Sequence, residues 1–285
     1  MMIRDFWMRV SKQLADEGIV ESGIEAEIIL RHTLDMERAD FFAALDDRIT
    51  PLQERKTGRL LERRVAGEPL AYMLGHREFY GLDFYVNPHV MIPRQETEIL
   101  VDKVLNLSKE EPSQRLQIAD VGTGSGAIAV AIAHNLPSAT LYATDSSREA
   151  LSAAKVNVRC HRLSERIHLC YGDLLEALSD PVDIIVSNPP YLKTSEIAGL
   201  QPEVTREPVC ALDGGTDGLD VMKHLFRQAP YYMRPGGRLL VEIASQQLES
   251  VLWMGRCAFP TARISFDRDM LNLPRVVSIA MPNPL

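Results

Sequence analysis

Residues 116–133 read Leu-Gln-Ile-Ala-Asp-Val-Gly-Thr-Gly-Ser-Gly-Ala-Ile-Ala-Val-Ala-Ile-Ala, two apolar segments joined by a glycine-rich loop. The first segment has the length of a buried strand and the second that of a buried helix. In parallel α/β sheets a ligand binds beyond the carboxyl ends of the strands, where such a loop lies. Glycines at 122, 124 and 126 permit backbone angles closed to other residues and let a ligand approach the main chain. This stretch predicts a nucleotide-type binding loop.

Short apolar runs separated by helical stretches surround the loop and predict a doubly wound, mostly parallel α/β sheet. The last two runs have no helix between them, so we expect an antiparallel hairpin at one sheet edge. A helix over Glu96–Leu105 and a polar loop over Ser108–Arg115 precede the first run. The seven predicted strands cover residues 116–121, 139–144, 166–170, 182–186, 237–244, 262–266 and 275–280.

The first part of the chain has helical periodicity and almost no strand signal. Helices are expected near residues 3–14, 24–34 and 41–45, and from Thr50-Pro-Leu-Gln53 to about Ala66. Thr50, Pro51 and Gln53 form the sequence signature of a capped helix start. A hairpin over Phe79–Val86 follows. We therefore divide the chain into a helical domain (1–76), a hairpin linker (77–95) and a catalytic domain (96–285).

The expected fourth helix carries a basic outer face that comprises Arg55, Lys56, Arg59, Arg63 and Arg64. The face is interrupted by Glu54 and Glu62. It has two interpretations: a solvated surface with local ion pairs, or a docking surface for an acidic partner.

Composition excludes several classes of protein. The 285 residues carry a formal net charge of −8, the opposite of what a nonspecific nucleic-acid binder needs. The longest apolar run is Gly126–Ala133, far shorter than the roughly 20 residues of a membrane span. No secretion signal opens the chain, so we expect a cytoplasmic protein. Cys160, Cys170, Cys210 and Cys257 lack short paired spacings, and we expect them to be reduced and mostly buried, with no metal site.

Carboxylates follow the second and third predicted strands at the same edge as the glycine loop. Asp145 is placed to accept hydrogen bonds from both hydroxyls of a ribose. Asp173 can accept from an adenine amino group or cap the helix that follows, and Leu174 can cover a base. A structural turn and a nicotinamide or flavin site remain alternatives, but S-adenosylmethionine is the ligand that these residues favour.

The fourth strand ends in Asn188-Pro189-Pro190-Tyr191. Such a turn could be merely stiff, but its position at the ligand edge favours a chemical role. The Asn188 side-chain oxygen and the Pro189 carbonyl can each accept one N–H of a planar NH2 group, which fixes its plane. The prolines hold these acceptors in place, and Tyr191 offers a flat surface for stacking. Proximity and electrostatics would supply most of the acceleration, without a dedicated general base.

The loop Asp120–Gly126 together with Asn188–Tyr191 resembles class I S-adenosylmethionine-dependent methyltransferases that modify planar nitrogens. More narrowly, the chain resembles the peptide chain release factor glutamine methyltransferases over almost its whole length. The further matching segments are Pro69–Tyr72, Arg77–Phe79, Ile92–Glu98, Glu207-Pro208, Ala211–Gly215 and Arg234–Gly237.

The resemblance implies methylation of N5 of the glutamine in the Gly-Gly-Gln motif of class 1 release factors, which modulates translation termination. S-adenosyl-L-homocysteine would be the product, and the helical domain would help to dock the protein substrate. We expect a monomer that binds neither membrane nor nucleic acid. The implied cofactor residues are Gly122, Thr123, Gly124, Ser125, Gly126, Asp145, Asp173, Leu174 and Asn188. The implied substrate residues are Asn188, Pro189, Pro190 and Tyr191, of which Asn188, Pro189 and Tyr191 are the catalytic candidates.

Two positions depart from the family pattern: Gln95, where proline is more frequent, and Ala244, where glycine is common. The competing hypotheses are a ribosomal-protein glutamine methyltransferase, an N6-adenine methyltransferase, a noncatalytic adaptor and a nicotinamide oxidoreductase. The acidic charge disfavours the adenine enzyme, because such proteins generally need a basic cleft.

Overall fold

The computed structural model describes residues 1–109 and 115–283, and the chain divides into two compact units. The first unit comprises Met1–Gly75 and Gln201–Arg206, and the second comprises His76–Leu200 and Glu207–Leu285. Residues 201–206 therefore return to the helical unit, which the sequence-based division did not include. Most of the predicted polar loop Ser108–Arg115 lies outside the described residues.

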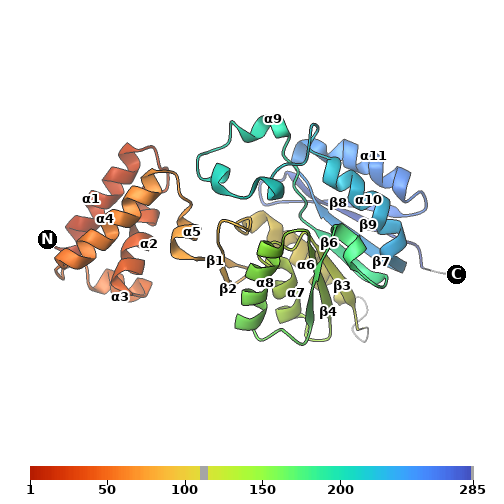
Figure 1. The fold of residues 1–285 in the computed structure, drawn as a ribbon, viewed down its shortest axis with the longest axis horizontal. Coiled ribbons are helices and arrows are strands. Elements are labelled where there is room, and N and C mark those ends of the chain that lie inside the picture. The colour runs from red at the N-terminus through yellow and green to blue at the C-terminus, as the bar shows by residue number, and fades with distance from the viewer. Residues whose placement is uncertain (110–114, 284–285) are drawn as a thin grey trace. The chain divides into compact units, whose positions relative to one another are not determined.

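The first unit is helical, as the periodicity predicted (Figure 1). Its core is built on Phe6, Val10, Leu14 and Phe41, all nearly inaccessible to solvent. The predicted capping box is present: Thr50 Oγ1 accepts from the Gln53 N–H, and the Gln53 side chain accepts from the Thr50 N–H. The helices are α1 (Ile3–Asp16), α2 (Ser22–Leu34), α3 (Arg38–Ala43), α4 (Pro51–Val65) and α5 (Leu70–Leu74).

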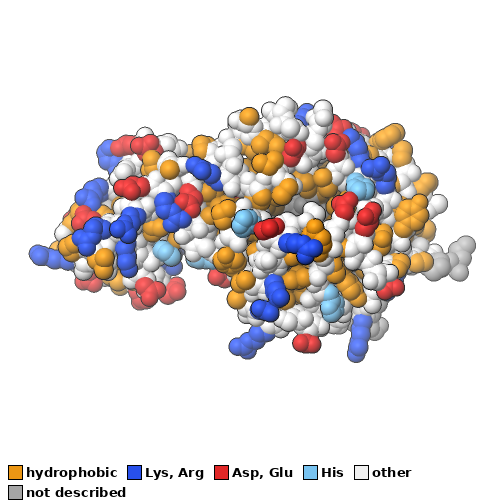
Figure 2. Space-filling model, viewed as in Figure 1, with side chains coloured by type: hydrophobic (Ala, Val, Ile, Leu, Met, Phe, Trp, Pro, Cys, Tyr) orange, Lys and Arg blue, Asp and Glu red, His pale blue; other side chains and the backbone are white. Residues whose placement is uncertain are grey.

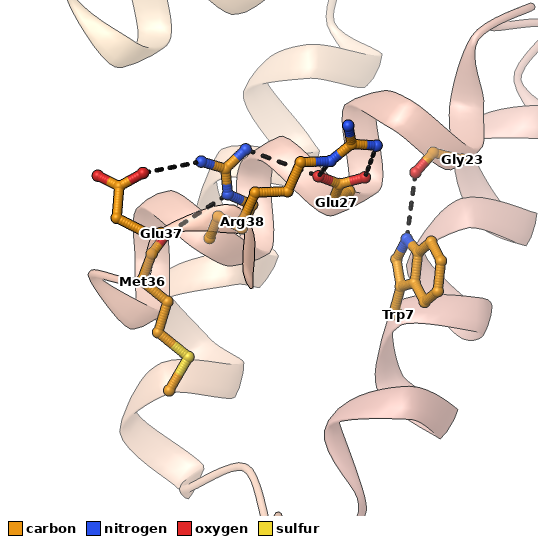
Figure 3. A network of polar contacts seen from close by, with 7 residues as sticks. Trp7, Gly23, Glu27, Met36, Glu37 and Arg38 are labelled. Atoms are coloured by element: carbon orange, nitrogen blue, oxygen red, sulfur yellow. Dashed lines mark hydrogen bonds and ion pairs between the residues drawn. The ribbon is translucent and has the colours of Figure 1, made fainter. Parts of the chain in front are cut away.

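Polar side chains connect these helices to one another (Figure 3). The indole N–H of Trp7 donates to the carbonyl of Gly23 over 3.1 Å, joining α1 to α2. Arg38 at the start of α3 donates to the buried carboxylate of Glu27 in α2, with Nε 2.9 Å from Oε1. A buried carboxylate is tolerated when it is paired and hydrogen-bonded, and the guanidinium meets this requirement.

The basic face of α4 is smaller than predicted. Arg64 is buried rather than outward-facing, and it pairs with Glu25 of α2 and with Glu203 of the returning segment. The remaining members of the face are Arg55, Lys56, Arg59 and Arg63, and all are exposed. Figure 2 shows basic and acidic side chains intermingled over this unit. Long-range pairing within the unit thus removes Arg64 from the surface.

The second unit contains the predicted seven-stranded sheet, in the order β5-β4-β3-β6-β7-β9-β8. Strands β5, β4, β3, β6 and β7 are parallel, and β9 pairs antiparallel with both β7 and β8, which confirms the predicted edge. The strands are β3 (Gln117–Val121), β4 (Thr140–Asp145), β5 (Ile167–Tyr171), β6 (Val182–Ser187), β7 (Met233–Glu242), β8 (Arg263–Arg268) and β9 (Pro274–Ala280).

Helices cover both faces of this sheet and form two separate apolar layers (Figure 1). Successive residues such as Ile184 and Ile185 point into opposite layers, because side chains alternate along a strand. One layer contains α6 (Glu98–Ser108), α7 (Ala127–Asn135) and α8 (Arg148–Cys160), and the other contains α10 (Asp220–Tyr232) and α11 (Leu248–Ala258). Shorter elements are α9 (Thr194–Ile197), η1 (Gln95–Thr97), η2 (Leu174–Ala177), η3 (Val204–Arg206), η4 (Val209–Ala211) and η5 (Ser245–Gln247).

The predicted hairpin forms from β1 (His76–Phe79) and β2 (Leu82–Tyr85), and it packs into the core of the second unit. The side-chain amide of Asn157 in α8 accepts from the Tyr85 N–H over 2.7 Å and donates to the Tyr85 carbonyl over 2.9 Å. The same amide donates to the carbonyl of Ser125 over 2.8 Å. One side chain therefore joins the hairpin to the glycine loop.

The prediction of mostly buried cysteines is wrong. Cys160, Cys210 and Cys257 are exposed and Cys170 is half-buried, although all four are free, as expected. The exposed residues lie at the end of α8, in η4 and near the end of α11, and these positions are not on the apolar stripe of a helix. No helix in the described part of the chain is long and apolar enough to cross a membrane.

Candidate active site

A cleft at the carboxyl edge of the parallel strands collects most of the predicted cofactor residues. It encloses about 1110 Å³, counting its open mouth. The predicted residues that line it are Gly122, Thr123, Gly124, Ser125, Asp145, Asp173, Leu174, Asn188 and Pro190. Gly126, Pro189 and Tyr191 are not among the described residues that line it.

The three glycines of the loop all adopt left-handed backbone angles, with φ of +73°, +55° and +80° at Gly122, Gly124 and Gly126. A Cβ added to Gly122 or Gly124 would meet no protein atom within 4 Å, so open space borders the main chain there. A Cβ at Gly126 would lie 3.2 Å from the Cβ of Ala154 in α8. The first two glycines thus leave room for a ligand, and the third allows close packing of α8.

Asp120 lies beneath the loop and holds it in shape. Its Oδ2 accepts from the Thr123 hydroxyl over 2.6 Å and from the Ala129 N–H over 3.1 Å, and the residue is fully buried. Burial raises the pKa of Asp120 to about 6, although both hydrogen bonds act to lower it. The carboxyl therefore connects β3, the loop and the first turn of α7, and it has no direct access to the cleft.

Asp145 occupies the position predicted for a ribose acceptor. Its Oδ2 accepts from the Gly124 N–H over 2.9 Å, and its Oδ1 accepts from the Ser147 N–H over 2.8 Å. Burial raises its pKa, and these backbone donors oppose the rise by favouring the charged form. Each carboxylate oxygen has further acceptor capacity, so Asp145 can bind two hydroxyls while it holds the loop.

Asp173 and Leu174 form the far side of the cleft. Asp173 makes no side-chain bond to the start of η2, so the structure does not show the alternative capping role. Its Oδ2 lies 3.4 Å from Nδ1 of His224 in α10. Leu174 has a φ of +49°, which is strained for a branched side chain. Such strain is characteristic of binding sites, where surrounding structure holds a residue in an unfavourable conformation.

The Asn-Pro-Pro-Tyr turn is held by two side chains that sequence reasoning missed. Nδ2 of Asn188 donates to Oγ1 of Thr97 over 3.0 Å, which leaves the Asn188 Oδ1 available to the cleft. Nε2 of Gln247 donates to the carbonyls of Tyr191 and Gly218, each over 3.0 Å. The turn is therefore rigid because of distant partners as well as its prolines.

A buried carboxyl lies next to the turn. Glu242, the last residue of β7, is 1% exposed, and burial raises its pKa to about 7. The Thr97 and Tyr191 hydroxyls and the charge of Arg275 oppose this rise. Burial also raises the pKa of the Tyr191 phenol to about 12, so Tyr191 remains neutral. The sequence signal for Glu242 was a glutamate that ends an otherwise apolar strand, Leu239–Glu242.

The segment after the hairpin forms another wall of the cleft, with Met91 and Pro93 among the lining residues. Buried Glu207 accepts from the Ile92 N–H over 3.1 Å and pairs with Arg94. The sequence-based linker 77–95 therefore contributes directly to the site. Only the matching segment Ile92–Glu98 pointed to this, and no chemical reasoning from the sequence identified it.

Family models match both units of the chain. Residues 5–75 match the model described as PrmC N-terminal domain, and residues 95–207 match the methyltransferase small domain. The release factor glutamine methyltransferase of Moorella thermoacetica is 42% identical over 257 residues, 90% of each chain. That of Coxiella burnetii is 37% identical over 279 residues, 97% of this chain and 98% of its own. This chain belongs to the release factor glutamine methyltransferase family.

Solved structures agree on the fold. A methyltransferase from Pyrococcus furiosus superposes with a TM-score of 0.52 over 81% of this chain and 98% of its own, at 16% identity. That identity supports the methyltransferase fold alone. Family membership makes the protein an S-adenosylmethionine-dependent methyltransferase, as predicted, and it favours methyl transfer over the alternative of hydride transfer.

Proposed function

We propose that this protein transfers a methyl group from S-adenosylmethionine to the side-chain nitrogen N5 of the glutamine in the Gly-Gly-Gln motif of class 1 release factors. The observation that carries the proposal is the orientation of Asn188. Its NH2 group is bonded to Thr97, so its oxygen is the atom available to a substrate NH2 in the cleft. The names of the relatives favour release factors over ribosomal proteins and adenine as acceptors.

The residues of the cleft fit S-adenosylmethionine. Open space beside Gly122 and Gly124 admits a ligand against the main chain, and the partly satisfied carboxylate of Asp145 suits ribose hydroxyls. Asp173 and Leu174 are placed to accept from the adenine amino group and to cover the base. The bound cofactor would supply an electrophilic methyl group on a sulfonium, which leaves as a neutral thioether. We propose no metal in this reaction.

The chain's own residues orient the acceptor nitrogen. An amide nitrogen is a weak nucleophile because its lone pair is delocalised into the carbonyl. The Asn188 oxygen and the Pro189 carbonyl each accept one N–H, which fixes the NH2 plane and favours the positive charge that develops on nitrogen. Tyr191 does not line the cleft, so its stacking on the glutamine remains a prediction. Pro190 limits the movement of the turn.

The helical unit, in this proposal, docks the release factor. The exposed side chains of Arg55, Lys56, Arg59 and Arg63 offer positive charge to an acidic surface of the partner. We place the reaction in the cytoplasm, with the enzyme acting as a monomer, because its substrate is a translation factor.

The test is transfer of labelled methyl from S-adenosylmethionine to a purified class 1 release factor. The matched control is the same factor with the Gly-Gly-Gln glutamine changed to alanine. We expect label in the first protein and none in the second. Equal labelling of both would show another acceptor residue, and no labelling despite measured cofactor binding would redirect the search to ribosomal proteins and nucleic acids.

A further inference from the structure

We propose that Glu242 is a positioning residue of the methyl-transfer site: it sets the direction of a hydrogen-bond relay through Thr97 that makes Asn188 present its oxygen to the substrate. The inference rests on the proposed function, because it concerns how the glutamine NH2 is held. Glu242 itself has no contact with the substrate in this arrangement.

Glu242 lies at the centre of the second unit, where a carboxyl is costly. It ends β7, which pairs with β6 on one side and with β9 on the other, and its register partner on β9 is Val276. Its neighbour Val241 pairs with Ser187, the residue just before Asn188. An unpaired buried charge is strongly unfavourable, so a carboxyl at this position calls for a physical explanation.

The groups around Glu242 connect it to the substrate turn. Its carboxyl interacts with the hydroxyls of Thr97 and Tyr191, whereas its Oε2 has no hydrogen-bond partner among the described residues. Arg275 of β9 faces it with positive charge and Glu96 of η1 with negative charge. Arg275 is itself held by Asp269, with Nη2 2.9 Å from Oδ2. The Thr97 hydroxyl also meets Asn188 Nδ2 at 3.0 Å.

The direction of this relay follows from the number of hydrogens. An ionised carboxylate can only accept, and a threonine hydroxyl has a single hydrogen. If Thr97 donates that hydrogen to Glu242, its oxygen must accept from Asn188, so the Asn188 NH2 turns toward Thr97. An asparagine amide has two orientations related by a half-turn, and its partners decide which one is stable. The carboxylate thus places the Asn188 oxygen at the cleft.

The reverse orientation would oppose the reaction. If residue 242 donated to Thr97, the threonine hydrogen would be free to bond the Asn188 oxygen. The Asn188 NH2 would then face the cleft and meet the substrate NH2, donor against donor. A buried donor without an acceptor costs its full desolvation, so the substrate would be held badly or not at all. Glutamine at 242 has nearly the shape of glutamate but can donate in this way.

The decisive experiment compares Glu242→Gln with wild type, using purified release factor as methyl acceptor. We expect kcat to fall by about 30-fold to 100-fold, because a correctly oriented acceptor at the reacting group is lost. The dissociation constant of S-adenosylmethionine should stay within about threefold of wild type, since no cofactor contact is changed. The pH profile adds a second readout: wild-type kcat should fall on the acid side as Glu242 is protonated, and the Gln variant should lack that limb.

Two variants at position 97 keep the test independent of Glu242 folding effects. Thr97→Val removes the relay hydroxyl and should lower kcat as much as Glu242→Gln, whereas Thr97→Ser retains the hydroxyl and most of the activity. The double variant Glu242→Gln/Thr97→Val should be no worse than either single variant within about twofold, because residues of one network are not additive. Ser278→Ala, which alters another unpartnered buried hydroxyl in the same sheet, is the control and should remain within about twofold of wild type.

The outcomes separate this inference from the proposed function. Turnover of Glu242→Gln within about twofold of wild type, or fully additive losses in the double variant, would overturn the relay. Loss of turnover in Asn188→Ala together with normal turnover in Glu242→Gln would retain the proposed site and reject the positioning role. Normal turnover in both would reject the assignment of Asn188 as well.

Discussion

The two sides of the active-site cleft are held together in different ways. On the cofactor side, bonds join residues close in sequence: Thr123 to Asp120, Ser147 to Asp145, and Gly124 to Asp145, which are 21 positions apart. On the substrate side, Asn188 bonds to Thr97, which is 91 positions away. Gln247 reaches the Tyr191 carbonyl across 56 positions. A loop that is built locally leaves a sequence signature, whereas a turn supported by distant segments shows only its own residues.

Removing the acceptor on the substrate side should have the largest effect. Asn188→Ala deletes the oxygen presented to the glutamine NH2, and we expect kcat to fall by about 100-fold or more. Affinity for S-adenosylmethionine, measured by calorimetry, should change by less than about threefold, because the cofactor side is built separately. Unchanged turnover would show that the turn is only a stiff connection.

The corresponding change on the cofactor side is Asp145→Ala. We expect cofactor binding to weaken by about 1.5–3 kcal/mol, the range for hydrogen bonds to a charged group. The loop should also loosen, because the Gly124 and Ser147 N–H groups lose their acceptor. Asp145→Asn retains one oxygen and should bind with intermediate affinity. A wild-type dissociation constant for Asp145→Ala would remove this residue from the site.

The buried Glu242 on the substrate side predicts a pH effect on stability. Its folded-state pKa is raised from 4.5 to about 7, so its contribution to stability is full below about pH 4.5 and is lost as pH rises through 7. Between pH 5.5 and pH 8, wild type should lose about 2 kcal/mol of unfolding free energy relative to Glu242→Gln. Denaturant titrations across this range measure the difference. Parallel curves for the two proteins would contradict the assigned burial effect, and Ser278→Ala should run parallel to wild type.

The smallest expected effect concerns a purely local feature outside the cleft. Thr50→Ala removes the cap of α4, and we expect a loss of about 1 kcal/mol in the stability of the helical unit. Thr50→Ser retains a hydroxyl acceptor and should restore most of it. Thermal unfolding followed by circular dichroism provides the measurement. Identical stability of all three proteins would mean that the capping box adds nothing in this context.

The fold was largely predictable because its signals are periodic. Alternation of apolar runs and helical stretches identified every strand of the large sheet within a few residues, and the capping signature located the start of α4. Predictions failed where pairing decided the outcome. Arg64 fits the outer face of α4 by spacing, yet Glu25 and Glu203 hold it inside the unit. The cysteines resemble core residues by type, but they lie at helix ends and in loops.

The sequence by itself determined the glycine loop, the carboxylates after β4 and β5, and the Asn-Pro-Pro-Tyr turn, because each depends on residues adjacent in the chain. Only the tertiary structure decided which way Asn188 faces. Thr97 and Glu242 lie on η1 and β7, and no local pattern pairs either of them with the end of β6. Orientation of an amide depends on the donors and acceptors that surround it in space, and the folded sheet brings them together.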